Sequence, residues 1–220
     1  MDDSPLLFDL VRTTRGRPER AAEHYLRGRS DVLHEAGVAK TSQLYQLRQQ
    51  NVPATPLEGA VLAGVHVIED TAHPLFSFTA LPDIELLGSA TYRAMAHCGQ
   101  RLDPTASDPP TTMMVLTHPT DLGHDASFNA WYSDEHMPDV ALTPGFRGAT
   151  RYRPVAQRGG APLGYLCIYE VDAPFHRDID ARLNEWQVET EVPDRVPMPR
   201  TPAGEPVLTI DLWGYFSRLA

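Results

Sequence analysis

The feature that most constrains this chain is a turn-rich stretch near its midpoint, because the sequence on either side follows the same plan. The stretch runs from Asp103 to Thr112, is rich in proline, threonine and aspartate, and has no apolar periodicity, which is typical of a linker. Each half of the 220 residues has the size of a small domain. We therefore expect a first repeat at residues 1–103, a linker at 104–111 and a second repeat at 112–220.

The second half shows its elements clearly. Apolar alternation predicts strands, and three- and four-residue spacing predicts helices. A helix begins at Asp125 or Ser127, which can cap it, and ends or kinks at Pro138, which has no N–H to donate. The expected order is strand 113–118, helix from 125, strand 146–155, strand 163–171, helix 173–192 and strand 207–217. This βαββαβ order is that of a ferredoxin-like unit.

The first half follows the same order less clearly. We expect strand 6–11, helix 18–36, strands 39–47 and 60–69, and a helix within 83–95. A closing fourth strand is not evident. When the halves are aligned, Tyr25 falls on Tyr132 and Arg29 on His136. The correspondence is short, but it favours a duplicated unit.

A motif in the second half resembles a known family. It reads Trp131-Tyr132-Ser133-Asp134-Glu135-His136-Met137-Pro138-Asp139, followed by Pro144-Gly145-Phe146 and Arg151-Tyr152. It is similar to the signature W-Y-x-x-E-H-x-P-(D/E)…P-G-F…R-Y of dimeric α+β barrel proteins, which include EthD-like domains. The first half has Arg29 in place of the histidine and lacks the Trp-Tyr pair, so its motif is degenerate. The resemblance implies an α+β fold, with two ferredoxin-like repeats packed sheet to sheet as a dimeric α+β barrel from one chain.

Charge and composition argue against several classes of binding partner. The net charge is −10 and Lys40 is the only lysine, so the basic stripe needed for nucleic acid or an anionic membrane is missing. No apolar run approaches the roughly 20 residues that span a bilayer. The first residues are acidic rather than basic, which argues against a signal peptide and for a cytoplasmic protein. Cys98 and Cys167 lie far apart without metal-binding spacing, and no metal is expected.

His136 is the first candidate for catalysis. It lies beside the helix end expected at Pro138, where free carbonyls stabilise an imidazolium, and Glu135 and Asp139 act in the same direction. A histidine held near neutrality can exchange protons with an enolisable or phenolic substrate. The alternative is that His136 caps the helix or bonds a carbonyl that holds the turn.

Alternation along the predicted strands separates two kinds of side chain. On the last strand one side carries Leu208, Ile210, Leu212 and Phe216, and the other carries Thr209, Asp211, Trp213 and Tyr215. We expect the aliphatic side beneath the helices and the aromatic side where the two sheets meet or a ligand rests. His118 shares the parity of Met114 and Leu116, which predicts that it faces the helices and approaches His136.

The candidate site combines these residues. His136 is expected to be the acid or base, assisted by His118 or Asp211. The substrate-binding candidates, for which plain core packing is the alternative, are Trp131, Tyr132, Tyr152, Tyr169 and Trp213. Arg151 or Arg153 could stabilise an enolate, although we expect both to face solvent.

The resemblance implies fold better than activity, because relatives include cofactor-free oxygenases, polyketide and phenolic cyclases, lactone isomerases and haem enzymes. We expect a cofactor-independent enzyme that acts on a hydrophobic aromatic or polyketide-like carbonyl compound as a cyclase, isomerase or monooxygenase. One alternative is a non-catalytic small-molecule binding protein. Another is a haem enzyme in which His136 or His176 holds the iron. A homodimer is left open.

Overall fold

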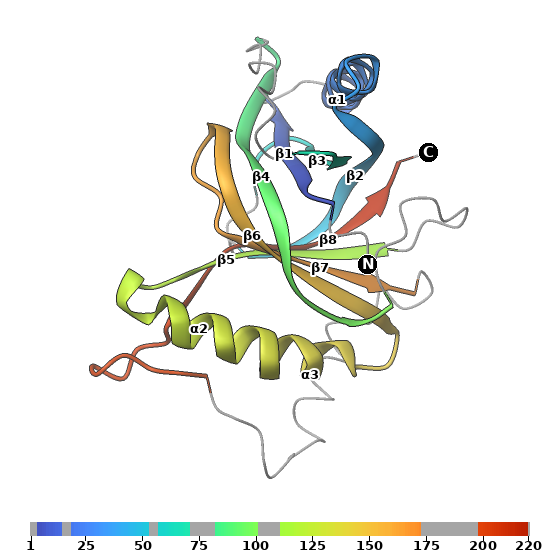
Figure 1. The fold of residues 1–220 in the computed structure, drawn as a ribbon. Helices are drawn as coiled ribbons and strands as arrows, with labels where there is room; N and C mark the ends of the chain where they lie inside the picture. Colours follow the sequence, from blue (N-terminus) through green and yellow to red (C-terminus); the bar gives the residue numbers. More distant parts are fainter. Residues whose placement is uncertain are drawn as a thin grey trace.

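The structure is a computed structural model that describes residues 4–14, 19–52, 57–70, 82–100, 111–172 and 198–219. Its strands are β1 (Leu6–Thr13), β2 (Ala39–Val52), β3 (Val61–Ile68), β4 (Ile84–Gly99), β5 (Thr111–Pro119), β6 (Phe146–Gly160), β7 (Tyr165–Val171) and β8 (Leu208–Arg218). They close into a barrel in the order β1-β3-β2-β8-β5-β7-β6-β4 (Figure 1).

The barrel consists of two sheets with the same internal order. In the first repeat β4, β1, β3 and β2 lie side by side, and in the second repeat β8, β5, β7 and β6 do so. The sheets meet where β2 pairs with β8 and where β4 pairs with β6, both antiparallel. The predicted pair of ferredoxin-like repeats is therefore confirmed. Both seams form within one chain, so every sheet edge is paired without a second copy.

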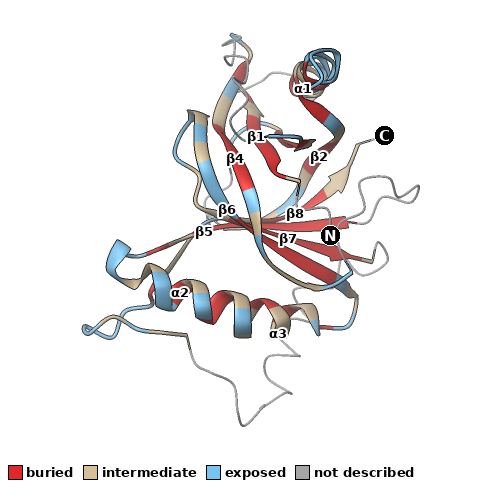
Figure 2. Cartoon of the chain, in the orientation of Figure 1, coloured by how far each residue is buried: buried red, intermediate tan, exposed pale blue. Residues whose placement is uncertain are grey.

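Helices cover the outside of the barrel. The helix α1 (Glu19–Glu35) lies on the first sheet, and a long helical segment lies on the second. This segment, which we call the second-repeat helix, comprises η1 (Leu122–His124), α2 (Asp125–Trp131), η2 (Tyr132–His136) and α3 (Met137–Ala141). The two helical elements lie on opposite sides of the barrel (Figure 1), and their outer surfaces are exposed while the strands between them are largely buried (Figure 2).

Aliphatic and aromatic side chains are divided between the barrel interior and the outer layer, in the opposite sense to the prediction. The interior of the second repeat is formed by Met114, Leu116, Leu166, Ile168, Leu212 and Phe216. The layer between the second sheet and its helix, which we call the helix–sheet layer, contains Cys167, Tyr169 and Tyr215 together with Phe128, Trp131 and Tyr132. The prediction was wrong because the interior of an eight-stranded barrel is filled by the inward side chains of its own strands.

A bulge in β8 also breaks the predicted parity. Leu116 pairs with Leu212 and Thr117 with Ile210, so Asp211 is an extra residue without a partner across β5. Leu208 and Ile210 consequently pack against the helix–sheet layer, whereas Leu212 lies in the interior. One inserted residue reverses the facing of every position beyond it.

The helix expected within 83–95 is wrong, because this segment is the strand β4. Leu86, Leu87, Ala90 and Met95 favour a helix locally, but β4 is held between β1 and β6 by antiparallel pairing on both edges. Ser89, Ala90, Thr91 and Tyr92 are all buried, so neither face carries the polar alternation that identifies a half-exposed strand. Pairing with distant strands decides the conformation here.

The remaining expected elements agree with the structure where it describes them. Pro144 and Gly145 favour a turn after the second-repeat helix, because proline presets φ and glycine accepts a positive φ. The turn forms, with the Phe146 N–H donating to Thr143 O at 3.0 Å and Gly145 at φ 102°. The expected helix at 173–192 and most of the expected linker lie outside the described residues. In the described ranges, no helix has both the length and the apolar character to cross a membrane.

Candidate functional site

The second-repeat helix widens where the sequence motif lies. Tyr132–His136 is a π-helical segment, and the Met137 N–H donates to the Tyr132 carbonyl five residues earlier. Pro138 follows at the start of α3 and has no N–H to give. The prediction was that the helix ends or kinks at Pro138. It does not end there: the helix widens into the π-helical turn just before the proline and continues to Ala141. His136 is not at a helix terminus, so the charge of a helix end does not act on it.

The His136 ring lies among aromatic rings of the same helix. Its face stacks on Trp131, with centroids 4.8 Å apart and planes 20° apart. The Tyr132 ring meets it edge-on, with a centroid distance of 4.9 Å. Trp131 and Tyr132 are buried, but His136 is only partly buried. His136 therefore lies at the rim of the helix–sheet layer, where it can contact both the packed rings and a molecule from solvent.

Arg151, on β6, is the most unusual residue of the layer because its charged side chain has 0% exposure. Its Nη1 donates to Asn129 O at 3.1 Å and Ser133 Oγ at 2.8 Å, and its Nη2 donates to Asn129 Oδ1 at 2.8 Å. Its Nε has no hydrogen-bond partner. The prediction that Arg151 and Arg153 face solvent is therefore correct for Arg153 and wrong for Arg151.

Three aromatic rings surround the Arg151 guanidinium. The carbon Cζ lies 4.2 Å from the Tyr132 ring centroid and 4.8 Å from those of Phe128 and Tyr165. Such contacts offset part of the cost of burying a cation. Burial lowers the pKa of Arg151, but a guanidinium still remains charged at neutral pH. A positive charge is therefore fixed beneath the π-helical segment.

Asn129 connects this charge to the protein surface. Its Nδ2 donates to Tyr165 Oη at 2.8 Å and to Asp125 Oδ2 at 3.1 Å, while the Tyr165 hydroxyl donates to Asp125 Oδ1 at 2.8 Å. Asp125 is thus two hydrogen bonds away from Arg151 and does not contact it. The arrangement fixes the direction of the guanidinium without neutralising it directly.

The groups beside Arg151 on the second sheet are protonated at neutral pH. Burial raises the pKa of the Cys167 thiol to about 12, despite a hydrogen bond with Tyr169 and the nearby charge of Arg151. Burial likewise raises the pKa of Tyr132 and of Tyr169. Neither the thiol nor the hydroxyls supply a negative charge to balance the arginine.

The structure brings together some of the predicted substrate-binding residues and separates others. Trp131, Tyr132 and Tyr169 are buried in the helix–sheet layer, and the partly buried Trp213 packs against it, with its Nε1 donating to Met113 Sδ at 3.2 Å. Tyr152 instead faces the barrel interior. Because successive residues of a strand alternate, Arg151 and Tyr152 cannot serve the same face.

His118 and Asp211 form a pair elsewhere, at one end of the barrel. His118 Nδ1 lies 2.9 Å from Asp211 Oδ2, and both side chains are exposed. Thr117 pairs with Tyr165, which packs on the helix–sheet layer, so His118 points to the opposite, interior side of the sheet. The expectation that His118 faces the helices and approaches His136 is therefore wrong.

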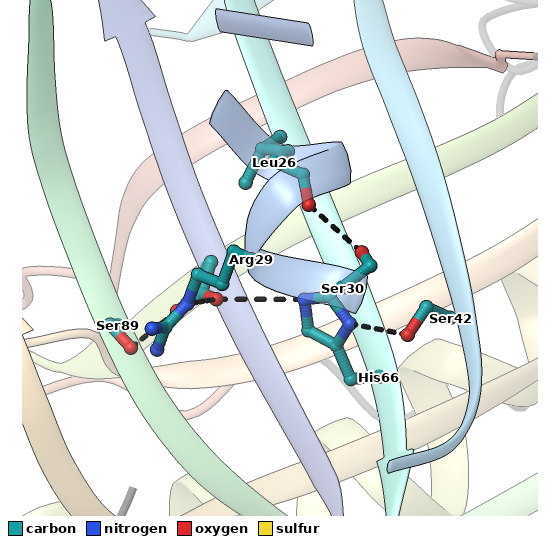
Figure 3. A network of polar contacts seen from close by, with 7 residues as sticks. Leu26, Arg29, Ser30, Ser42, His66 and Ser89 are labelled. Atoms are coloured by element: carbon teal, nitrogen blue, oxygen red, sulfur yellow. Dashed lines mark hydrogen bonds and ion pairs between the residues drawn. The ribbon is translucent and has the colours of Figure 1, made fainter. Parts of the chain in front are cut away.

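A second polar cluster, in the first repeat, was missed by the sequence analysis. Asp9 of β1 is fully buried and accepts from Arg29 Nε and from Ser89 Oγ, each at 2.5 Å. His66 of β3 lies between Asp9 and Ser42 (Figure 3). An aspartate in the apolar run Leu6 to Val11 was the available signal, since a charge on a buried strand requires a partner.

Several solved structures have an architecture similar to that of this chain. A structure named as an anthrone oxidase-like protein aligns with 100% of this chain and 93% of its own, at 12% identity and a TM-score of 0.51. The chain has the dimeric α+β barrel fold. A monooxygenase-like protein from Listeria innocua aligns over 97% of this chain and 94% of its own, at 13% identity and a TM-score of 0.40.

A third similar structure is a ferredoxin fold protein from Listeria monocytogenes, named as related to antibiotic biosynthesis monooxygenases. It covers 97% of this chain and 95% of its own at 13% identity and a TM-score of 0.43. No protein-family model and no curated protein matches the sequence. At identities this low the likeness establishes the fold, and the activity of this barrel must be argued from its side chains.

The described residues do not fit the haem alternative. A haem ligand needs an imidazole nitrogen directed at an open slot for the porphyrin. The layer beneath His136 is filled by Arg151 and the rings of Phe128 and Tyr132, so the described residues leave no porphyrin-sized slot on the inner side of this histidine. His176 lies outside the described residues. Among the described side chains, no group of three or more metal-ligating residues occurs either.

Proposed function

We propose that this barrel is a cofactor-independent enzyme that removes a proton from a small aromatic or polyketide-like carbonyl compound at the rim of the helix–sheet layer. His136 takes the proton, and Arg151 stabilises the oxyanion that forms. Oxygenation is our first choice for the overall reaction, because the structure with the highest TM-score reported above is named anthrone oxidase-like. Cyclisation and isomerisation of such compounds begin with the same proton transfer.

The observation that carries the proposal is the buried guanidinium of Arg151. Among the described residues, no carboxylate lies within ion-pair distance of it, and its Nε–H is unpaired. Burying a charge without a counter-ion costs several kcal/mol. A cation kept in this state is suited to stabilise negative charge that appears only during a reaction, since fixed donors in a dry site act most strongly there.

His136 is positioned for the proton transfer. Its ring is held by the stack on Trp131 and is still partly exposed. An imidazole has the right basicity to accept a proton from an enolisable or phenolic compound near neutral pH. A planar aromatic substrate could lie against the same wall of rings. We propose no role for His118 and Asp211 in this step, because they lie on the other face of the sheet.

The proposal is tested by comparing Arg151→Lys with Arg153→Lys. Both arginines are on β6, two residues apart, but only Arg151 is buried in the layer. Lysine keeps the charge but loses the planar fork that Asn129 and Ser133 hold. With dithranol, a hydroxylated anthrone, as substrate, we expect kcat/KM to fall about tenfold to a hundredfold for Arg151→Lys, measured by oxygen uptake and product mass. Arg153→Lys should match the wild type.

Thermal melts must first show that both variants are folded. Equal activity of the folded Arg151→Lys variant and the wild type would contradict the role of Arg151. Tight binding of aromatic ligands with no turnover of any of them would favour the non-catalytic binding protein instead.

A further inference from the structure

We propose that Ser42 is a nucleophile, activated by His66 and Asp9, in a second reactive site beneath α1 that accepts an activated acyl compound such as a small ester. The three residues lie on adjacent strands of the first repeat, on the outer face of the barrel. This site is separate from the helix–sheet layer of the second repeat and does not depend on the function proposed for it.

The geometry of the three side chains is that of a nucleophile, a base and an orienting acid. Ser42 on β2 and His66 on β3 are direct cross-strand partners, and Ser42 Oγ lies 2.8 Å from His66 Nδ1. On the far side of the ring, His66 Nε2 lies 3.5 Å from Asp9 Oδ2 (Figure 3). The second distance exceeds a direct hydrogen bond, as is common for catalytic contacts before a substrate binds.

The surroundings of Asp9 determine which atom of His66 carries the proton. Burial alone would raise the pKa of Asp9, but the contact with His66 and the charge of Arg29 outweigh it and lower the pKa to about 2. The carboxylate is therefore ionised, and we assign the N–H of a neutral His66 to Nε2, which faces it and has no hydrogen-bond partner among the described residues. The other nitrogen, Nδ1, then has a lone pair, so the Ser42 hydroxyl must donate to it. This is the direction in which a base activates a hydroxyl.

Gly64 makes this arrangement sterically feasible. It pairs with Asp9 across β1 and β3, and the imidazole of His66 lies over it. A Cβ at position 64 would lie 2.8 Å from His66 Nε2 and 3.3 Å from the Leu26 side chain of α1. A larger residue would push the ring away from Asp9. Position 64 therefore favours glycine because the His66 ring lies so close to its backbone, and not because the backbone conformation demands it.

The three side chains differ in solvent exposure as a reactive site requires, because the nucleophile is nearer to solvent than the base and the acid. Asp9 and His66 have 0% exposure, whereas Ser42 is only partly buried. In the reaction, Ser42 Oγ bonds to the acyl carbon, the leaving group departs with the bonding electron pair, and His66 Nδ1 takes the serine proton. Arg29 already pairs with Asp9 and so weakens its support of the imidazolium. We expect the covalent step to be easier to detect than turnover.

The test is covalent labelling of the full chain with an alkyl fluorophosphonate. Ser42 Oγ should bond to phosphorus while fluoride leaves, and peptide mass spectrometry should locate the adduct on Ser42. We expect the adduct to be absent in Ser42→Ala and its rate of formation to fall at least about 10²-fold in His66→Gln. Ser127→Ala, which removes an exposed serine that donates to His124 O, should label like the wild type.

Two results would overturn the proposal. One is no adduct on Ser42 in the folded wild-type protein, and the other is an equal labelling rate in His66→Gln. Should His66→Gln fail to fold, the pH profile of wild-type labelling takes its place. A rate that levels off above one ionisation in the histidine range supports activation by His66, whereas a rate that follows hydroxide without a plateau refutes it. Gly64→Ala should slow labelling by displacing the ring.

Discussion

Replacing Asp9 by asparagine is expected to lower the free energy of unfolding by about 3–5 kcal/mol, since it removes the carboxylate of a buried ion pair. The Arg29 side chain, which pairs with Asp9, is only 8% exposed, and Asp9 also accepts from Ser89. Because Arg29 belongs to α1 and Asp9 to β1, the loss should also loosen the helix from the sheet. Chemical denaturation at neutral pH measures the effect.

Glu85→Gln is the matched control, because it also breaks an arginine–carboxylate pair next to β1. Arg12 Nε lies 2.7 Å from Glu85 Oε2, but both side chains are partly exposed. Exposed pairs contribute about 0–1 kcal/mol. A loss for Asp9→Asn no larger than that for Glu85→Gln would show that the first-repeat cluster does not stabilise the fold.

The same aspartate gives the protein a defined acid sensitivity. Its folded pKa of about 2 lies below its ordinary value of 3.8, so the carboxylate form stabilises the folded state. This contribution is fully present above pH 4 and is lost as the pH falls from about 4 to about 2. Denaturation curves of the wild type should show this loss, and Asp9→Asn should lack it. The same slope in both proteins would mean that other groups cause it.

Replacing His136 by glutamine is expected to lower turnover of an anthrone-type substrate by about 10²–10⁴-fold, the usual effect of removing a general base. Glutamine can keep hydrogen bonds and part of the packing against Trp131, so the protein should fold. The effect should be on kcat more than on KM, because the proton is transferred after the substrate binds.

His124→Gln provides the control from the same helical segment. His124 lies at its start, where Nδ1 is 2.9 Å from Asp121 Oδ2, away from the aromatic layer. This variant should retain full activity. If His136→Gln is also fully active, the proposed role of the histidine is refuted. The Arg151 variants test the stabilisation of the oxyanion separately.

The order of most elements was predictable from local signals, such as strand alternation and the Pro144-Gly145 turn. The packing of the two repeats into one barrel was expected only from the resemblance of the motif around Trp131 and His136. β4 was not predictable in this way, because its conformation depends on β1 and β6, which lie far away in the chain. Its Ala and Leu residues report helix propensity, which tertiary pairing overrides.

The candidate site was predictable only in part, for a related reason. The motif identified Trp131, Tyr132 and His136 as neighbours, since they lie on one helix. The burial of Arg151 could not be inferred, because its partners Asn129 and Ser133 approach it only after β6 packs beneath that helix. The pairing of His118 with Asp211 depends on the bulge in β8, and no residue in this segment indicates a bulge.

Hydrogen exchange with and without dithranol tests the central claim most directly, namely that the substrate binds at the rim of the helix–sheet layer beside His136. Mass spectrometry of peptides locates the amides that the ligand protects. We predict slower exchange in residues 132–141 and in β6, with no change in α1. Protection confined to α1 and β2, or to strands lining the barrel interior, would contradict the account.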